Sequence, residues 1–205
     1  MANPQDVLDF WLREIGSEGW YDGGKAIDVA CRERFGGIWA AAHEGSLDHW
    51  IDGPDSTLAF LIVTDQFPRN IHRGTALAFA TDARALAAAR KAVDEGWDLE
   101  IPEPERQFFY MPFEHSEDAS DQLLSVKLLS ERLSSNPDMA LHARAHQEII
   151  RRYGRFPTRN EALEYYRRVA LSGKLNIRLF EEVQSVLPEG KSFRVQTTKA
   201  EYRAA

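Results

Sequence analysis

The sequence has one cysteine among 205 residues, which excludes a disulfide framework. A chain without disulfides suits a reducing compartment, so we expect it in the cytoplasm. Cys31 lies in an apolar stripe at helical spacing, which favours a buried, inert thiol. Long apolar runs are also missing, because the longest, residues 58–63, is far shorter than the ~20 residues that span a bilayer. We therefore expect no membrane segment.

Positive charge is in deficit. Lys and Arg number 25 against 32 Asp and Glu, for a formal charge of -7, so there is no global positive field to attract nucleic acid or an anionic membrane. Any anion site must then be local. The amino-terminal stretch lacks the basic and apolar regions of a secretory signal. No phosphate loop, dinucleotide fingerprint or nucleophile elbow occurs, so we expect no cofactor and no motif names a reaction.

Helical patterns dominate what is present. Hydrophobic residues make up 43% of the chain, enough to bury a core, and they recur at helical spacing without an alternating strand pattern. Short connections favour antiparallel helix pairs, so the expected fold is all-α. Residues 56–66 are apolar on all sides, which predicts a central buried helix. We expect one helical domain over residues 1–187 and a loosely ordered tail over residues 188–205, which have few large apolar side chains.

The segment DQFPRN, residues 65–70, places a carboxylate on an apolar helix face. Asp65 continues the stripe of that helix into its last turn, where a negative charge opposes the helix dipole. A cation should therefore lie nearby, and Arg69 and Arg73 are the nearest in sequence. Because a residue before proline is normally extended, Phe67 is predicted to end the helix.

A similar segment, RFPTRN, spans residues 155–160. Here a structural explanation competes with a functional one, since Thr158 and Glu161 have the spacing of a capping box for a following helix. Arg155 and Arg159 would then pair with carboxylates at the edge of the core.

The third segment is PFEHSED, residues 112–118. Ser116 is a helix-cap candidate, and Glu117 suits the positive first turn of the next helix. Neither role explains Glu114 and His115. A histidine titrates near neutral pH and a carboxylate can orient it, so this pair has the residue types needed for proton transfer.

His142 and His146 are four residues apart, a spacing that permits two metal ligands on one helix face. No glutamate of the zinc-hydrolase pattern lies between them. His146 shares its stripe with Ile149 and Ile150, which favours a hydrogen-bonded histidine at the core. We therefore predict no metal site.

With DQFPRN, the following RGTALAFATD, PFEHSED and RRYGRFPTRN in this order, the chain resembles the bacterial domain-of-unknown-function family 924 from residue 7 to residue 160. Beyond Asn160 it departs from the family pattern. The resemblance implies a fold similar to tetratricopeptide-type helical proteins, and it implies no established reaction. It also emphasises the residues that match the family's motifs, which are Asp65, Gln66, Arg69, Asn70, Arg73, His115, Ser116, Glu117, His146, Arg155, Arg159 and Asn160.

Three hypotheses follow. In the first, the three segments converge on a polar pocket for a small anionic molecule, in a hydrolase-type enzyme whose His115 is the general base, oriented by Glu114 or Glu117. The groups that would hold the carboxylate or phosphate are Arg69, Arg155 and Arg159, with Asn70 and Asn160 as amide donors. In the second, helix pairs form a groove for a peptide or protein partner. In the third, the charged residues only pair with one another and fix the packing of the helices.

Overall fold

The computed structural model describes most of the chain and divides it into two units, which we call the helical unit (residues 1–156) and the strand unit (residues 157–205). The described residues are 3–21, 24–157, 183–189, 192–197 and 201–204. Every regular element of the helical unit in this range is a helix, so the predicted all-α class is confirmed. Within the same range, no helix combines the length and apolar character needed to cross a bilayer.

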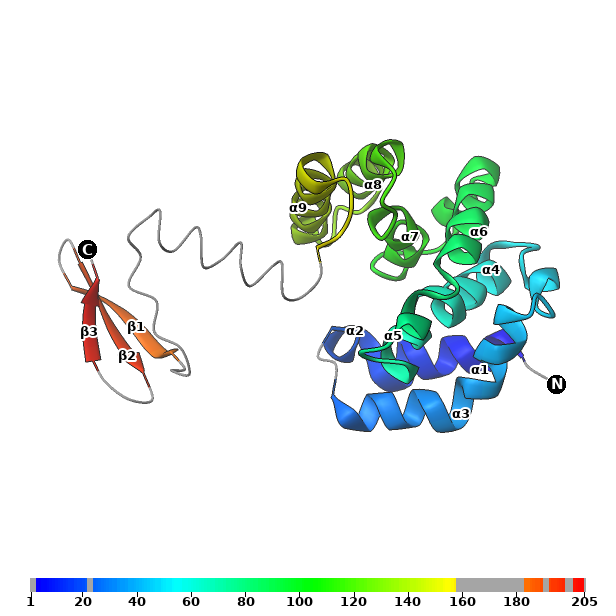
Figure 1. Ribbon diagram of the computed structural model, residues 1–205, viewed down its shortest axis with the longest axis horizontal. Coiled ribbons are helices and arrows are strands. Elements are labelled where there is room, and N and C mark those ends of the chain that lie inside the picture. The colour runs from blue at the N-terminus through cyan, green and yellow to red at the C-terminus, as the bar shows by residue number, and fades with distance from the viewer. Residues whose placement is uncertain (1–2, 22–23, 158–182, 190–191, 198–200, 205) are drawn as a thin grey trace. The chain divides into compact units, whose positions relative to one another are not determined.

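Figure 1 shows the helical unit as a succession of short and medium helices. Its α-helices are α1 (Pro4–Leu8), α2 (Gly16–Gly19), α3 (Lys25–His43), α4 (Pro54–Leu61), α5 (Phe67–Ile71), α6 (Asp82–Glu95), α7 (Met111–Glu114), α8 (Ala119–Arg132) and α9 (Pro137–Tyr153). Short segments of π-helix are η1 (Asp9–Ile15) and η3 (Ile62–Gln66). Turns of 3-10 helix are η2 (Asp48–Trp50), η4 (Ala76–Phe79), η5 (Trp97–Glu100) and η6 (Glu105–Phe109).

Local sequence signals explain where several helices begin and end. The Asn3 side chain accepts a hydrogen bond from the backbone of Gln5 and caps α1, whose first residue is proline. The Asp118 side chain caps α8 in the same way, by accepting from two backbone amides. Gly96 and Gly154 end α6 and α9 in the left-handed conformation, which costs glycine little.

The predicted central helix corresponds to α4 and η3. Its side chains from Leu58 to Val63 are all essentially inaccessible to solvent. Figure 1 places α4 between α1 and α6, in keeping with its contacts to both. A helix enclosed on both sides needs apolar residues all round, which is the pattern the sequence has.

The prediction that Phe67 ends this helix is wrong. Phe67 has helical dihedral angles, φ -59° and ψ -41°, and the chain continues through η3 into α5. Pro68 falls in the first turn of α5, where a missing amide donor costs little. Phe67 is fully buried, with its ring 4.8 Å from that of Phe35. Burial of such a ring is worth a few kcal/mol, which outweighs the local preference of a residue before proline.

The strand unit was not predicted. It contains an antiparallel sheet in the order β1 (Val183–Glu189), β2 (Ser192–Thr197) and β3 (Glu201–Ala204). Glu189 pairs with Ser192, and Phe193 pairs with Ala204. Strand β1 begins inside the expected helical domain over residues 1–187, and β2 and β3 lie in the expected loosely ordered tail over residues 188–205. The division of the chain between residues 156 and 157 also differs from the expected domain boundary after residue 187. The alternation of polar and apolar residues in SFRVQT was the available strand signal.

Candidate functional site

Two of the three predicted segments meet in the helical unit. The turn η3 carries Asp65, and α7 ends directly before His115. Although these residues are 50 positions apart in sequence, His115 Nδ1 lies 2.8 Å from Asp65 Oδ1. Pro112, in the first turn of α7, fixes where this short helix starts and therefore helps to place His115.

Asp65 is an ionised carboxylate in the interior. It is only 1% exposed, and Gln66 Nε2 donates a hydrogen bond to its second oxygen over 2.6 Å. Burial alone would raise the pKa of this carboxyl. The charges of His115 and Arg69 and the hydrogen bonds from His115 and Gln66 outweigh that cost and lower the pKa of Asp65 to about 2.

Arg69 is the cation expected beside Asp65. Its Nη1 lies 3.4 Å from Asp65 Oδ1, and its two amino groups donate to the two oxygens of Asp82 over 3.0 and 3.1 Å. The bidentate contact uses the face of the guanidinium that an anion would need. A carboxylate or phosphate ligand would therefore have to displace Asp82 to bind Arg69 in the same way.

Arg73 is turned toward a different partner. Its guanidinium donates to both oxygens of Asp28 over 2.8 Å and to Asn70 Oδ1 over 2.9 Å. Asn70 in turn donates from Nδ2 to the backbone oxygen of Gln66. Arg73 and Asn70 thus connect α5 to α3, and their described contacts do not include His115.

A second carboxyl–histidine pair follows His115 in the chain. Glu114 is 3% exposed, and its Oε1 lies 3.1 Å from His146 Nδ1 on α9. Its Oε2 is buried and has no hydrogen-bond partner within the described part of the chain. Burial raises the pKa of Glu114, whereas burial and the charge of His115 lower the pKa of His146. Both shifts disfavour the charged forms, so the surroundings of this pair make each group harder to ionise than it is in water.

The expected orientation of His115 by Glu114 or Glu117 is corrected by these contacts, because Asp65 is the carboxylate at its ring nitrogen. Glu117 Oε1 instead accepts a hydrogen bond from the backbone amide of Phe156 over 2.8 Å. The Phe156 ring meets His146 edge-on at 5.2 Å. The start of the RFPTRN segment, at Phe156, therefore lies against the Glu114–His146 pair.

The remaining predicted residues have mixed outcomes. The Ser116 hydroxyl donates to Asp121, and Asp118 rather than Ser116 caps α8. Arg155 donates to the backbone oxygen of Phe156. Arg159 and Asn160 lie outside the described residues, so their expected roles stay predictions.

Sequence reasoning missed two groups that border the site. Asp82 looks like a helix-terminal residue in the sequence, and its bidentate contact with Arg69 had no local signal. The Tyr21 hydroxyl donates to Gln107 Oε1, a partner 86 positions away. Burial and the nearby charge of Glu114 raise the pKa of Tyr21, so its hydroxyl stays protonated. Among the residues described, no three histidine, cysteine, aspartate or glutamate side chains are grouped to hold a metal ion.

The raised pKa of Glu114 predicts that this side chain stabilises the folded protein at low pH and destabilises it at high pH. A carboxylate paired with a cation, whose pKa is lowered, has the opposite effect. A carboxyl whose folded pKa is raised stabilises the protein fully below its unfolded pKa, about 4, and that stability is lost as pH rises through the folded pKa. Glu114→Gln keeps the neutral shape and is expected to unfold at a higher urea concentration than the wild type at pH 8. At pH 4.5 the two midpoints should agree more closely. A variant that is less stable than the wild type by the same amount at both pH values would contradict this assignment.

A family model described as a bacterial protein of unknown function, DUF924, matches residues 7–168. A solved structure of a protein of unknown function, ATU0120 from Agrobacterium tumefaciens, is 39% identical, with a TM-score of 0.71. The match covers 78% of this chain and 89% of that one. No curated protein matches the chain.

Proposed function

Since this chain belongs to the DUF924 family of bacterial proteins of unknown function, its chemistry must be inferred from its own residues, and we propose a hydrolase-type enzyme with His115 as general base. The observation that carries this proposal is the 2.8 Å contact between His115 Nδ1 and the buried, ionised Asp65. A carboxylate at Nδ1 favours the tautomer that has its proton there. It leaves Nε2 free of a proton, ready to accept one from water.

The positive charge that His115 would gain during the reaction supports its role as general base. When His115 accepts a proton, the imidazolium lies against a carboxylate that is already ionised and held by Gln66 and Arg69. The partner charge is therefore in place before the reaction, so little reorganisation is needed. The His115 side chain is 18% exposed, which is enough for contact with a ligand.

Glu114 completes an acid–base pair in this proposal. The pKa of Asp65 is lowered and that of Glu114 is raised, and such divergent environments are typical of carboxyls with separate roles. Water would lose a proton to His115 Nε2 as its oxygen attacks the substrate. Glu114 would give its proton to the leaving group, and solvent would return a proton from His115 to Glu114.

For the substrate we propose a small anionic molecule that exchanges with Asp82 on Arg69. Burial raises the pKa of Asp82 even though Arg69 and its hydrogen bonds act to lower it, so the ionised form of Asp82 has a desolvation cost at this position. Both side chains are partly exposed, at 24% for Arg69 and 29% for Asp82. A ligand carboxylate or phosphate would keep the bidentate geometry that a guanidinium prefers.

A second candidate is the binding of a peptide in a groove between helices. The observation that favours it is the exposure of Leu123 on α8 and Leu141 on α9, two helices that pack together. A binding module would keep its partner when His115 is replaced, whereas an enzyme of the kind proposed would lose turnover.

The test is a screen of small anionic esters, amides and phosphoesters, with the wild type and His115→Gln measured in parallel. Loss of a general base is expected to lower kcat by about 100-fold or more on any substrate found. His49→Gln is the matched control, because His49 is exposed on η2, and it should keep the wild-type rate. Turnover that survives in His115→Gln would overturn the proposal.

A further inference from the structure

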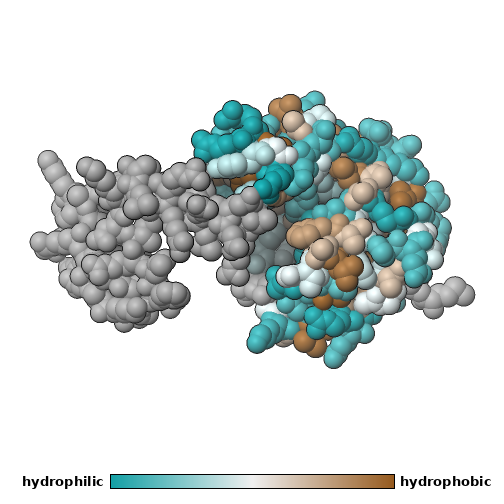
Figure 2. Space-filling view, viewed as in Figure 1, coloured by the Kyte–Doolittle hydropathy of each residue, from teal (hydrophilic) through white to brown (hydrophobic). Residues whose placement is uncertain are grey.

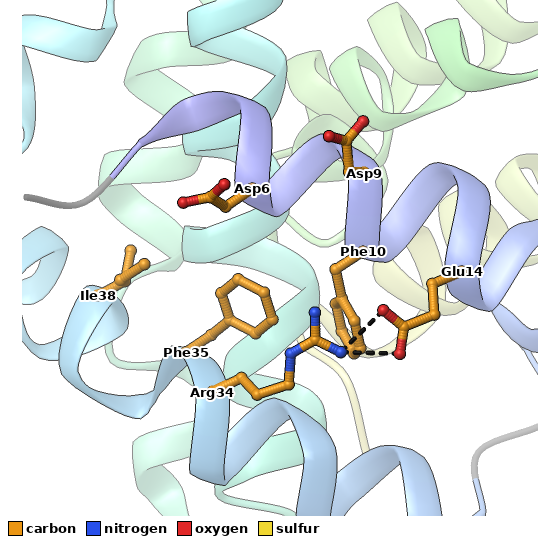
Figure 3. Close-up of a pocket in the computed structure, with 7 residues that line it drawn as sticks. All are labelled: Asp6, Asp9, Phe10, Glu14, Arg34, Phe35 and Ile38. Atoms are coloured by element: carbon orange, nitrogen blue, oxygen red, sulfur yellow. Dashed lines mark hydrogen bonds and ion pairs between the residues drawn. The ribbon is translucent and has the colours of Figure 1, made fainter.

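A surface hollow of about 350 Å³ lies on the helical unit, between α1 with η1 on one side and α3 on the other (Figure 3). Its lining consists of Asp6, Asp9, Phe10, Glu14, Arg34, Phe35 and Ile38. None of these residues belongs to the Asp65–His115 or Glu114–His146 pair. The hollow is therefore a separate candidate, and it does not depend on the proposed reaction.

The floor of the hollow already holds a cation. Phe10 and Phe35 are buried, with ring centroids 4.7 Å apart. The guanidinium carbon of Arg34 lies 4.4 Å from the Phe10 centroid and 5.4 Å from that of Phe35. Arg34 Nη1 also contacts both carboxylate oxygens of Glu14, at 2.7 and 2.8 Å, as the dashed lines in Figure 3 mark. An aromatic face flanked by a carboxylate is a known arrangement for recognising organic cations.

The lining has more negative charge than Arg34 can neutralise. Three carboxylates against one guanidinium leave a net charge of -2. Asp9 pairs with a cation outside the lining, since its Oδ1 lies 2.6 Å from Nη1 of exposed Arg13. The Asp6 carboxylate has no side-chain hydrogen bond or ion pair with any residue that the structure describes. In Figure 3, Asp6 lies on the side of the hollow where Phe35 and Ile38 provide apolar surface.

We propose that this hollow binds an ammonium or guanidinium group carried on an aliphatic stem. The stem would pack on Ile38, next to Phe35 in the lining of the hollow, and the cation would pair with Asp6, beside the place that Arg34 occupies. A volume of about 350 Å³ is at the small end of ligand sites, which suits one such group. A free polyamine and a lysine side chain of a partner share this chemistry. The protein's net charge of -7 would attract both.

The experiment is an NMR titration of the full chain with two probes, spermidine and a short neutral-capped peptide with one lysine. Saturable shifts of the amides of Phe10 and Ile38, with Kd in about the millimolar range, are expected for a partly exposed cation site. Saturation by the peptide points to a protein partner, and saturation by spermidine alone points to a free polyamine. If neither probe shifts these amides, the proposal is overturned.

Matched variants separate a local site from the general field of an acidic protein. Asp6→Asn is expected to weaken spermidine binding about threefold. Asp94→Asn makes the same charge change on the exposed end of α6 and should leave Kd unchanged. Arg34→Ala frees the Phe10 face and is expected to tighten binding, whereas Arg144→Ala, an equal charge change on α9, should not. Equal effects in each variant and its control would refute a site in the hollow.

Discussion

Asp65→Ala is expected to lower the free energy of unfolding by about 3 kcal/mol or more at pH 7. The reason is the loss of one partner from a buried cluster, which leaves His115 and Gln66 without the carboxylate they contact and Arg69 with one counterion instead of two. Urea denaturation at pH 7 measures the change. Asp94→Ala removes a carboxylate from an exposed position on α6, and its effect should stay within about 0.5 kcal/mol.

The pH dependence of this difference tests its cause. The pKa of Asp65 is about 2 in the folded protein and about 4 in an unfolded chain. A lowered folded pKa contributes stability that is present above the unfolded pKa and is lost as pH falls through the folded pKa. That contribution is about 2 to 3 kcal/mol. The gap between the wild type and Asp65→Ala should therefore narrow between pH 4 and pH 2, and a constant gap would show that lost packing, not charge, is responsible.

A double-mutant cycle separates a catalytic pair from a packing device. If Asp65 and His115 served only to fix the helices, removing both should restore much of the stability that removing Asp65 costs. If His115 is held for chemistry, the single variant His115→Gln should lose activity while the free energy of unfolding changes little. Activity and the free energy of unfolding can change independently, so the cycle distinguishes an enzyme from a protein whose charged residues only fix the packing of the helices.

Local periodicity explains how much of the fold could be predicted. The central helix is visible because enclosure by other helices requires apolar residues on every side, as in Leu58 to Val63. The odd carboxylate at Asp65 and the unexplained His115 stood out for a related reason: neither fits the local role of its segment. A residue that local rules do not explain is where a tertiary contact is needed.

The rest depended on distance in space. Asp65 contacts His115 and Asp82 contacts Arg69 because separate helices meet in the folded protein. The spacing of residues in the sequence does not encode these contacts. Phe67 is helical although a residue before proline prefers an extended conformation. The burial of its ring, which stabilises the helix, is a tertiary effect that the sequence of two adjacent residues does not encode. The short strand SFRVQT was too brief to stand out beside long helical patterns.

Phe67→Ala is expected to destabilise the protein by about 3 to 5 kcal/mol. The ring is fully buried and meets Phe10 at 5.9 Å, Trp11 at 5.5 Å and Phe35 at 4.8 Å, so truncation leaves a cavity where η1, α3 and α5 join. Because the first two contacts are edge-on, each adds about 1 kcal/mol beyond burial. Chemical denaturation gives the change in free energy.

Phe79→Ala is the matched control for this truncation, because Phe79 is 60% exposed and the change should cost within about 0.5 kcal/mol. Equal losses at the two positions would mean that Phe67 is not the packing centre described. Phe67 also stands two residues after Asp65, on the helix that brings this carboxylate to His115. A loosened α5 should therefore shift the resonances of the His115 ring more in Phe67→Ala than in Phe79→Ala, which removes only a cation–π contact with Arg69. That result would show that the position of Asp65 and His115 depends on the helix that continues through Phe67 and Pro68. The helix would then be needed at the site although a residue before proline disfavours it.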